Sequence, residues 1–191
     1  MMISTKVPLE NSNTVSSIVS LLVRFPEISS LWSHPTDGTL RLTYIVARRL
    51  AKPEQRELAV ILDDHVRAFV ALEGRDVNAI NVRCETDQAV TFIHCTRDSA
   101  SFTREELLLQ IGVLSARYGD ALVKNPVEEQ DEESAALEDE QVEHAIDAMR
   151  DPDQKRSLVG YRDERRVMVY FVKNRKAKAP APLSAADART A

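Results

Sequence analysis

The sequence has few of the features that identify secreted, disulfide-bonded or membrane proteins. It contains two cysteines among 191 residues, which are too few for the disulfide framework of a small secreted domain. No segment approaches the roughly 18 consecutive apolar residues of a membrane-spanning helix, and the N-terminus lacks the basic segment and apolar core of a signal peptide. We therefore expect a cytoplasmic protein that does not span a membrane.

Sequence motifs for catalysis are missing as well. Only five glycines occur, and none belongs to a phosphate-binding loop; a serine nucleophile elbow and a His-x-x-x-His pair are also absent. The formal net charge is −5, whereas a general nucleic-acid binder carries a basic excess that contacts phosphates. The sequence thus predicts a non-enzymatic protein without catalytic residues, metal or cofactor, and it argues against nucleic acid as the partner.

The residues that are present are those of a folded protein. Hydrophobic residues make up 43% of the chain and charged residues 29%, which is typical of a globular domain and unlike a disordered chain. The length is sufficient for one domain with a small addition and for a sizeable core. We therefore expect a protein that folds without disulfides or metals.

The clearest structural signal is a long helix that leads into a β-hairpin. Pro53 suits a first helical position, and Gly74 suits the left-handed residue just past a helix end. Apolar residues at three- and four-residue steps predict one buried helix face. That face comprises Leu58, Ile61, Leu62, His65, Phe69 and Leu72. Alternation of apolar and polar residues then predicts paired strands over residues 80–85 and 89–95.

A similar helix and hairpin precede this unit. The first helix is expected to end before Pro26, and strands are predicted over residues 28–32 and 40–46 around a turn at Gly38. The passage Phe25-Pro26-Glu27-Ile28 with its glycine-containing turn resembles the helix-to-hairpin passage of ferredoxin-like domains, which include small metal chaperones and amino-acid-sensing modules. The resemblance covers the first helix and hairpin, and it implies a ferredoxin-like style of fold without the Cys-x-x-Cys metal loop.

A third helix is predicted after the second hairpin. Thr103 and Glu106 have the spacing of a capping box, and Gly119 is a suitable helix terminator. The order helix, hairpin, helix, hairpin, helix is typical of an α+β protein and differs from the alternation of a parallel sheet. We therefore predict an α+β fold in which helices pack on one face of an antiparallel sheet.

Charge is strongly segregated in the last third of the chain. Residues 128–143 contain nine acidic side chains and no basic one, whereas residues 155–178 contain nine basic and two acidic side chains. Three interpretations remain for this pattern: solvation of a linker and a sheet edge, pairing within or between subunits, and a basic hairpin for DNA.

A helix with Val142, Ile146 and Met149 on one face, followed by a hairpin, is predicted in this charged part. Because a lone helix and a two-stranded hairpin are marginal in water, we expect these three side chains to dock on the preceding part of the chain or on a second chain. The predicted division is a core domain over residues 1–125, an acidic linker over 126–136, a docked helix and hairpin over 137–176, and a disordered tail over 177–191.

Two groups of residues are of types that bind metals or ligands. Cys84, His94 and Cys95 suit zinc, but the expected hairpin register separates the two sulfurs by roughly 13 to 16 Å, which excludes a disulfide and a shared metal. His65 lies on the predicted buried helix face, where an imidazole needs a hydrogen-bond partner. His65 and Tyr44 are the candidate contacts for a small ligand.

Three functions are compatible with these observations. The leading hypothesis is a non-enzymatic interaction module that binds another protein or its own copy as a homo-oligomer. The first alternative is a small-ligand sensor with a pocket between helices and sheet, contacted by His65 and Tyr44. The second alternative is DNA binding by the basic hairpin, which the acidic residues upstream oppose. The candidate interaction surface comprises Val142, Ile146, Met149, Arg162, Arg165 and Arg166.

Overall fold

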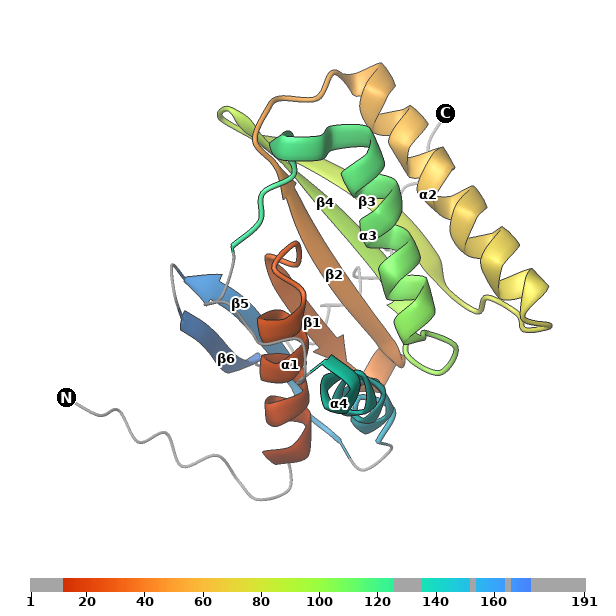
Figure 1. Ribbon diagram of the computed structural model, residues 1–191, viewed down its shortest axis with the longest axis vertical. Coiled ribbons are helices and arrows are strands. Elements are labelled where there is room, and N and C mark those ends of the chain that lie inside the picture. Colours follow the sequence, from red (N-terminus) through yellow and green to blue (C-terminus); the bar gives the residue numbers. More distant parts are fainter. Residues whose placement is uncertain (1–11, 126–134, 152–153, 164–165, 173–191) are drawn as a thin grey trace, which may run out of the picture.

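The computed structural model describes residues 12–125, 135–151, 154–163 and 166–172, in which the chain forms helices and six strands (Figure 1). The elements follow in the order α1 (Ser12–Arg24), β1 (Ser30–His34), η2 (Pro35–Asp37), β2 (Thr39–Val46), α2 (Lys52–Leu72), β3 (Ile80–Asp87), β4 (Val90–Asp98), α3 (Arg104–Tyr118), η3 (Gly119–Ala121), α4 (Ala135–Ala148), β5 (Ser157–Asp163) and β6 (Arg166–Val172).

The strands form one antiparallel sheet with the order β3-β4-β2-β1-β5-β6. Each sequential pair of strands is a hairpin, and the C-terminal hairpin joins the others because β5 pairs with β1, with Leu31 opposite Gly160. The predicted α+β class with an antiparallel sheet is confirmed. The ferredoxin-like style and the division into a core and a docked unit stay predictions, and the predicted disordered tail over residues 177–191 lies outside the described residues.

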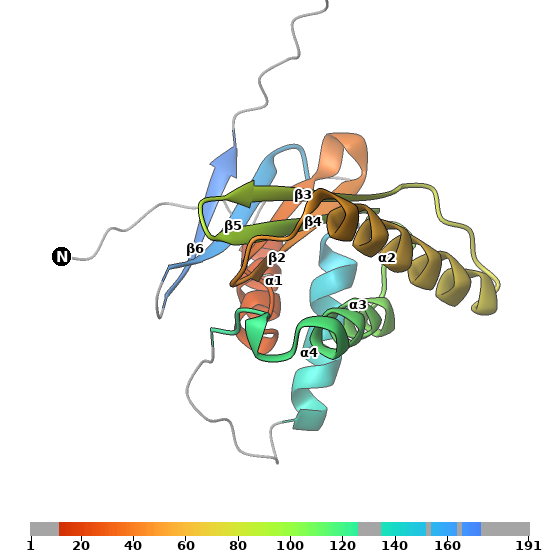
Figure 2. The same ribbon diagram turned by 90° about the horizontal axis from the view of Figure 1, so that it is seen from above.

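The helices cover one face of the sheet. Helices α1, α3 and α4 lie beneath it, and α2 packs at the rim next to β3 and against α3 (Figure 2). The core is formed where side chains from both layers meet, and on β2 it contains alternate residues that point toward the helices: Leu40, Leu42, Tyr44 and Val46. Within the described ranges, no helix has both the length and the apolar character needed to cross a membrane.

The sequence signals for helix ends correspond to real caps. The Thr103 side chain accepts a hydrogen bond from the Glu106 backbone N–H at the start of α3. Gly38 and Gly74 adopt positive φ angles of 60° and 66° in the turn between β1 and β2 and after α2, where a residue with a Cβ would be strained.

The buried face of α2 differs from the predicted one. Its buried residues recur mainly every four positions, namely Gln55, Leu58, Leu62, Val66 and Val70. His65 is exposed, and so is Leu72, which retains 87% of its accessible surface. The prediction of a buried His65 was wrong because the charged and apolar residues of this helix allow two neighbouring faces, and packing against β3 and α3 selects the one centred on Leu62 and Val66.

The first strand also begins later than predicted. The Ile28 backbone N–H bonds to the Phe25 carbonyl at 3.1 Å, which keeps Ile28 in the turn after α1. Strand β1 therefore starts at Ser30 and continues through His34, where Pro35 opens a short 3-10 helix.

The close approach of α1 to β5 requires a glycine. A Cβ on Gly160 would lie 2.2 Å from Cγ2 of Ile18 and 2.9 Å from Cδ1 of Leu22, both buried residues of α1. This contact is what allows α1 to cover the C-terminal hairpin.

We predict that Gly160→Ala lowers the free energy of unfolding by about 1 to 3 kcal/mol, because the added methyl group overpacks the α1–β5 contact. Chemical denaturation of the full chain measures this change. The control is Gly112→Ala in α3, where an added Cβ meets nothing within 4 Å and the better helix former should leave stability equal or higher. Equal stability of the Gly160→Ala variant and the unmutated protein would contradict the prediction.

Candidate functional site

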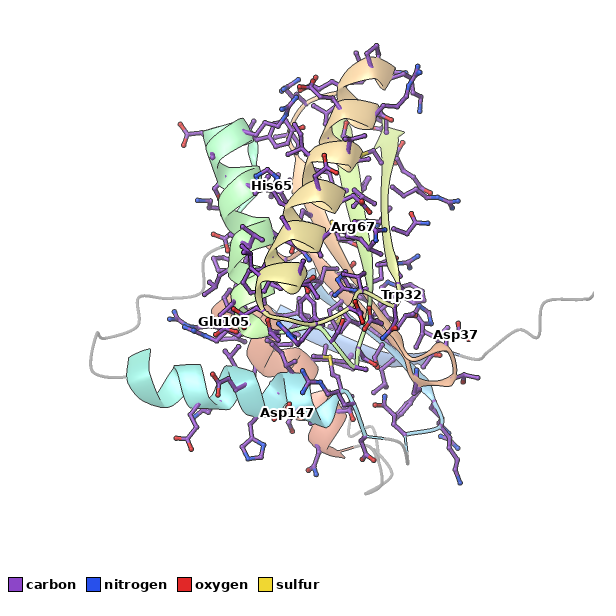
Figure 3. All side chains as sticks on the ribbon, turned by 90° about the vertical axis from the view of Figure 1, so that its right-hand side faces the viewer. Trp32, Asp37, His65, Arg67, Glu105 and Asp147 are labelled. Atoms are coloured by element: carbon purple, nitrogen blue, oxygen red, sulfur yellow. The ribbon has the colours of Figure 1, made fainter. Side chains whose placement is uncertain are left out.

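The face of the sheet that points away from the helices has no covering element among the described residues (Figure 2). Since side chains alternate along each strand, the register sets which residues share this face. Trp32, for example, lies opposite Arg41 on β2 and Val159 on β5, and it is on the side of the sheet away from α3 and α4 (Figure 3). We call this surface the open face.

The open face has an apolar half and a polar half. The apolar half spans β1, β5 and β6 and comprises Trp32, Val159, Tyr161, Met168 and Tyr170. The polar half spans β2, β4 and β3 and comprises Arg41, Asn81, Arg83, Glu85, His94 and Thr96. The polar half surrounds a depression of about 330 Å³.

All three described ring stacks lie on the open face. Trp32 stacks on His34 with centroids 5.6 Å apart, and Tyr161 stacks on Tyr170 at 5.6 Å. The third stack joins Phe92 to His94 at 6.3 Å. Tyr170 retains 48% of its accessible surface. An uncovered sheet face with this many rings is a surface on which another molecule can bury apolar area.

Arg41 links the two halves of the open face. Its guanidinium lies 4.6 Å from the centroid of the Trp32 ring, a distance typical of a cation–π contact. The Nε atom is buried and has no hydrogen-bond partner among the described residues. Burial lowers the pKa of Arg41, against the opposite effect of Glu85. The side chain is thus a partly buried cation on the open face, a group that attracts a carboxylate or another anion.

The two histidines of the open face are held neutral. Burial and, to a lesser degree, the positive charge of Arg41 lower the pKa of both His34 and His94. His94 Nδ1 is 3.0 Å from Thr43 Oγ1, and its Nε2 is 3.8 Å from a Glu85 carboxylate oxygen. At neutral pH the positive charge of the polar half therefore comes from Arg41 and Arg83.

The structure does not bring the two predicted ligand contacts together. Tyr44 is fully buried, and its hydroxyl donates to Gln110 Oε1 at 3.1 Å. His65 is exposed on α2 (Figure 3), and its Nδ1 lies 2.7 Å from the Ile61 carbonyl oxygen. No described interaction joins them, and their role as ligand contacts stays a prediction.

The predicted interaction residues fall into two groups. Val142, Ile146 and Met149 are buried in this chain's own core, so their apolar surface is already used. The Arg162 side chain turns inward and donates to the Phe25 and Ile28 carbonyl oxygens, at 3.3 Å each. Arg166 is exposed at the start of β6, and Arg165 lies outside the described residues.

The predicted separation of Cys84 and Cys95 along the hairpin was wrong, because the strands pair in a different register. Cys84 lies opposite Ile93, and Cys95 lies opposite Val82, so the two cysteines are diagonal neighbours and not four or five residues apart. The cause is the turn, which lies at residues 88–89 and not at Asp87. Both thiols are free, and burial raises the pKa of Cys95 and, less strongly, of Cys84. The described residues contain no cluster of three or more side chains that could hold a metal ion.

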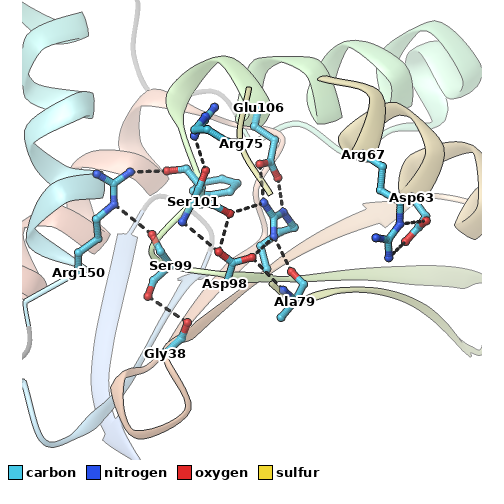
Figure 4. Close-up of polar contacts among 12 residues, drawn as sticks. Gly38, Asp63, Arg67, Arg75, Ala79, Asp98, Ser99, Ser101, Glu106 and Arg150 are labelled. Atoms are coloured by element: carbon cyan, nitrogen blue, oxygen red, sulfur yellow. Dashed lines mark hydrogen bonds and ion pairs between the residues drawn. The ribbon is translucent and has the colours of Figure 1, made fainter. Parts of the chain in front are cut away.

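A separate polar cluster is buried beneath the sheet at the end of β4 (Figure 4). Arg97 is 1% exposed and binds both carboxylate oxygens of the fully buried Glu106 on α3, at 2.7 and 3.0 Å. Arg97 also pairs with Asp98, which accepts hydrogen bonds from the N–H and hydroxyl of Ser101. Its burial shows that this cluster holds the loop between β4 and α3 in place and is not a binding surface.

Two more arginines, Arg75 and Arg150, donate hydrogen bonds to the loop between β4 and α3. Arg75 donates to the Ser101 carbonyl oxygen at 2.7 Å, and Arg150 donates to the carbonyl oxygens of Ser99 and Phe102 at 3.1 and 2.7 Å (Figure 4). The loop is therefore bonded to the segment after α2 and to the end of α4. Burial alone would raise the pKa of Asp98, but the Ser101 and Ala79 hydrogen bonds and the Arg97 charge hold it well below its usual range.

A second surface depression, of about 520 Å³, lies between α1 and α4 and is lined mainly by small and polar side chains. No family model, curated protein or solved structure matches the chain. The choice of a functional surface therefore depends on geometry, and the open face has the larger concentration of aromatic and cationic side chains.

We predict that Glu106→Gln lowers the free energy of unfolding by about 3 to 5 kcal/mol, because it leaves the Arg97 charge buried without its main counterion. Denaturant titration provides the measurement. Glu105→Gln is the control, because Glu105 is exposed on the same helix (Figure 3) and should change stability by less than about 0.5 kcal/mol. Similar small losses in both variants would show that the buried pair does not anchor α3.

The histidines of the open face give a prediction for pH. In the folded protein His94 and His34 should titrate below the ordinary value of 6.5. The unfolded chain then takes up protons first as pH falls below about 6.5, so the free energy of unfolding decreases in that direction. Titration of the imidazole signals by NMR measures both midpoints. A His94 midpoint at or above 6.5 would be inconsistent with its burial beside Arg41.

Proposed function

We propose that the protein is a non-catalytic protein-interaction module that binds its partner on the open face. The observation that carries this proposal is the uncovered sheet surface on which three ring stacks and the half-buried Arg41 lie together. Aromatic residues and arginine are the types most enriched among the residues that dominate binding energy in protein interfaces. Soluble proteins rarely leave a broad apolar patch exposed without such a use.

The two halves of the open face specify the chemistry of the partner. Trp32, Tyr161 and Tyr170 are suited to apolar or aromatic side chains that become buried on binding. Arg41 and Arg83 lie beside the depression of the polar half, where a carboxylate could accept charge-assisted hydrogen bonds. The partner we propose is a protein segment that presents apolar side chains to β1, β5 and β6 and an acidic side chain to β2 and β3.

The geometry favours the alternatives less. For DNA binding, the Arg162 side chain is bonded to backbone carbonyl oxygens beneath the hairpin and is not directed toward a phosphate. For the small-ligand sensor, the Tyr44 hydroxyl is already bonded to Gln110. Protein interaction is therefore the function we retain.

We predict that Trp32→Ala weakens binding of the native partner by about 30-fold or more, because Trp32 lies at the junction of the two halves and its loss removes a central contact. The partner is first identified by purifying the tagged full chain from its native cell, and its dissociation constant is then measured with purified proteins. Thermal melting verifies that the variant is folded.

The matched control is Leu72→Ala, which removes an exposed apolar side chain from α2 and should leave binding unchanged. If Trp32→Ala binds the same partner with the affinity of the unmutated protein, the open face is not the binding surface.

A further inference from the structure

The two edges of the sheet are built differently. Edge strand β3 places Asn81, Arg83, Glu85 and Asp87 on alternate positions, and α2 packs against it. Charged residues and a covering helix are the usual means by which proteins prevent unwanted pairing at a sheet edge. Edge β3 is therefore protected.

Edge strand β6 contacts helix α1, but along most of its length it lacks the charged residues that protect β3. Its sequence from Val167 to Val172 is Val-Met-Val-Tyr-Phe-Val, without a charge, a proline or a glycine. The inner edge of β6 pairs with β5, and within the described residues no strand pairs with its outer edge. Strands of this composition readily add another strand, because the backbone groups of an unpaired sheet edge can form hydrogen bonds with it.

We propose that β6 pairs with β6 of a second copy of this chain, in an antiparallel arrangement about a two-fold axis through Val169. An axis perpendicular to the sheet keeps the two sides of the strand distinct, so open-face residues meet open-face residues. Met168 then lies opposite Tyr170 of the second copy, and Val167 lies opposite Phe171. Pairs between aromatic and aliphatic side chains directly across two strands are stabilising.

Charge favours the same arrangement. Arg166 is the charged residue of β6 and is exposed at its beginning. In a parallel pair the two Arg166 side chains would lie beside each other, whereas in the antiparallel pair each lies opposite Val172 and the two are separated by roughly 20 Å along the strands. Like charges directly opposite each other destabilise a strand pair, so the sequence of β6 selects the antiparallel pairing.

Self-pairing would join the six-stranded sheets of two copies into one continuous sheet, with the apolar halves of the two open faces side by side. This inference deepens the proposed function, since it adds a second copy as one partner and doubles the surface offered to the other. It concerns the edge of β6, however, and the binding of another protein on the open face can succeed or fail independently.

The test compares two double variants of the full chain. The first variant combines Met168→Lys with Tyr170→Lys, so that lysine of one copy faces lysine of the other on both sides of the two-fold axis. The second combines Met168→Lys with Tyr170→Glu, so that lysine faces glutamate at the same two places. Both variants remove the same two apolar side chains from the same positions of each subunit, so loss of apolar surface is matched. Thermal melting of each variant verifies that both are folded.

Light scattering during size-exclusion chromatography measures the mass over a range of concentrations. We expect the unmutated protein to be a dimer. The dissociation constant of the lysine–lysine variant should be at least about tenfold larger than that of the lysine–glutamate variant. A monomer of the unmutated protein at high micromolar concentration, or equal dissociation constants for the two variants, would overturn the proposal.

These outcomes separate the two proposals. A monomeric protein whose partner binding still depends on Trp32 would refute self-pairing and retain the proposed function. A dimer with the expected charge dependence, whose partner binding is unaffected by Trp32→Ala, would support self-pairing and refute binding on the open face.

Discussion

The packing of the helices against one face of a six-stranded sheet determines which surfaces the protein can offer. Helices α1, α3 and α4 bury the side of the strands that contains Leu42, Ile93 and Leu158. The same alternation that places these residues inward places Trp32 and Tyr161 outward, because side chains alternate along a strand. The open face, on which we propose that a partner binds, follows from this one-sided covering. The outer edge of β6 follows from the strand order, in which β6 is last among the described strands.

The buried pair of Arg97 and Glu106 fixes the helical layer against this sheet. A paired charge in the interior adds little net stability compared with an apolar contact, but breaking it is costly, so it holds one arrangement against others. Because Arg150 at the end of α4 also bonds to the loop after β4, the network connects the middle of the chain to its C-terminal part. The open face is therefore presented by paired strands whose supporting helices are bonded to the sheet, and not by loops.

Local signals in the sequence predicted most elements, whereas the functional surface required the fold. Proline, glycine and the Thr103 cap mark helix ends through interactions within a few residues, and the predicted α+β class is confirmed. The open face depends on the pairing of β1 with β5, which places Leu31 opposite Gly160. These two residues are far apart in the sequence, and no pattern within a few residues predicts that their strands pair. Glu106 shows the same limit, because its capping-box spacing did not reveal that its carboxylate binds Arg97 beneath the sheet.

The most direct measurement of the central claim is amide hydrogen exchange of the full-length protein at low and high concentration. If the chain associates with a second copy through the edge of β6, the β6 amides over Arg166–Val172 should gain protection as concentration rises, while the amides of edge strand β3, Ile80–Asp87, should not change. Protection that rises equally at both edges, or at neither, would contradict self-pairing at β6.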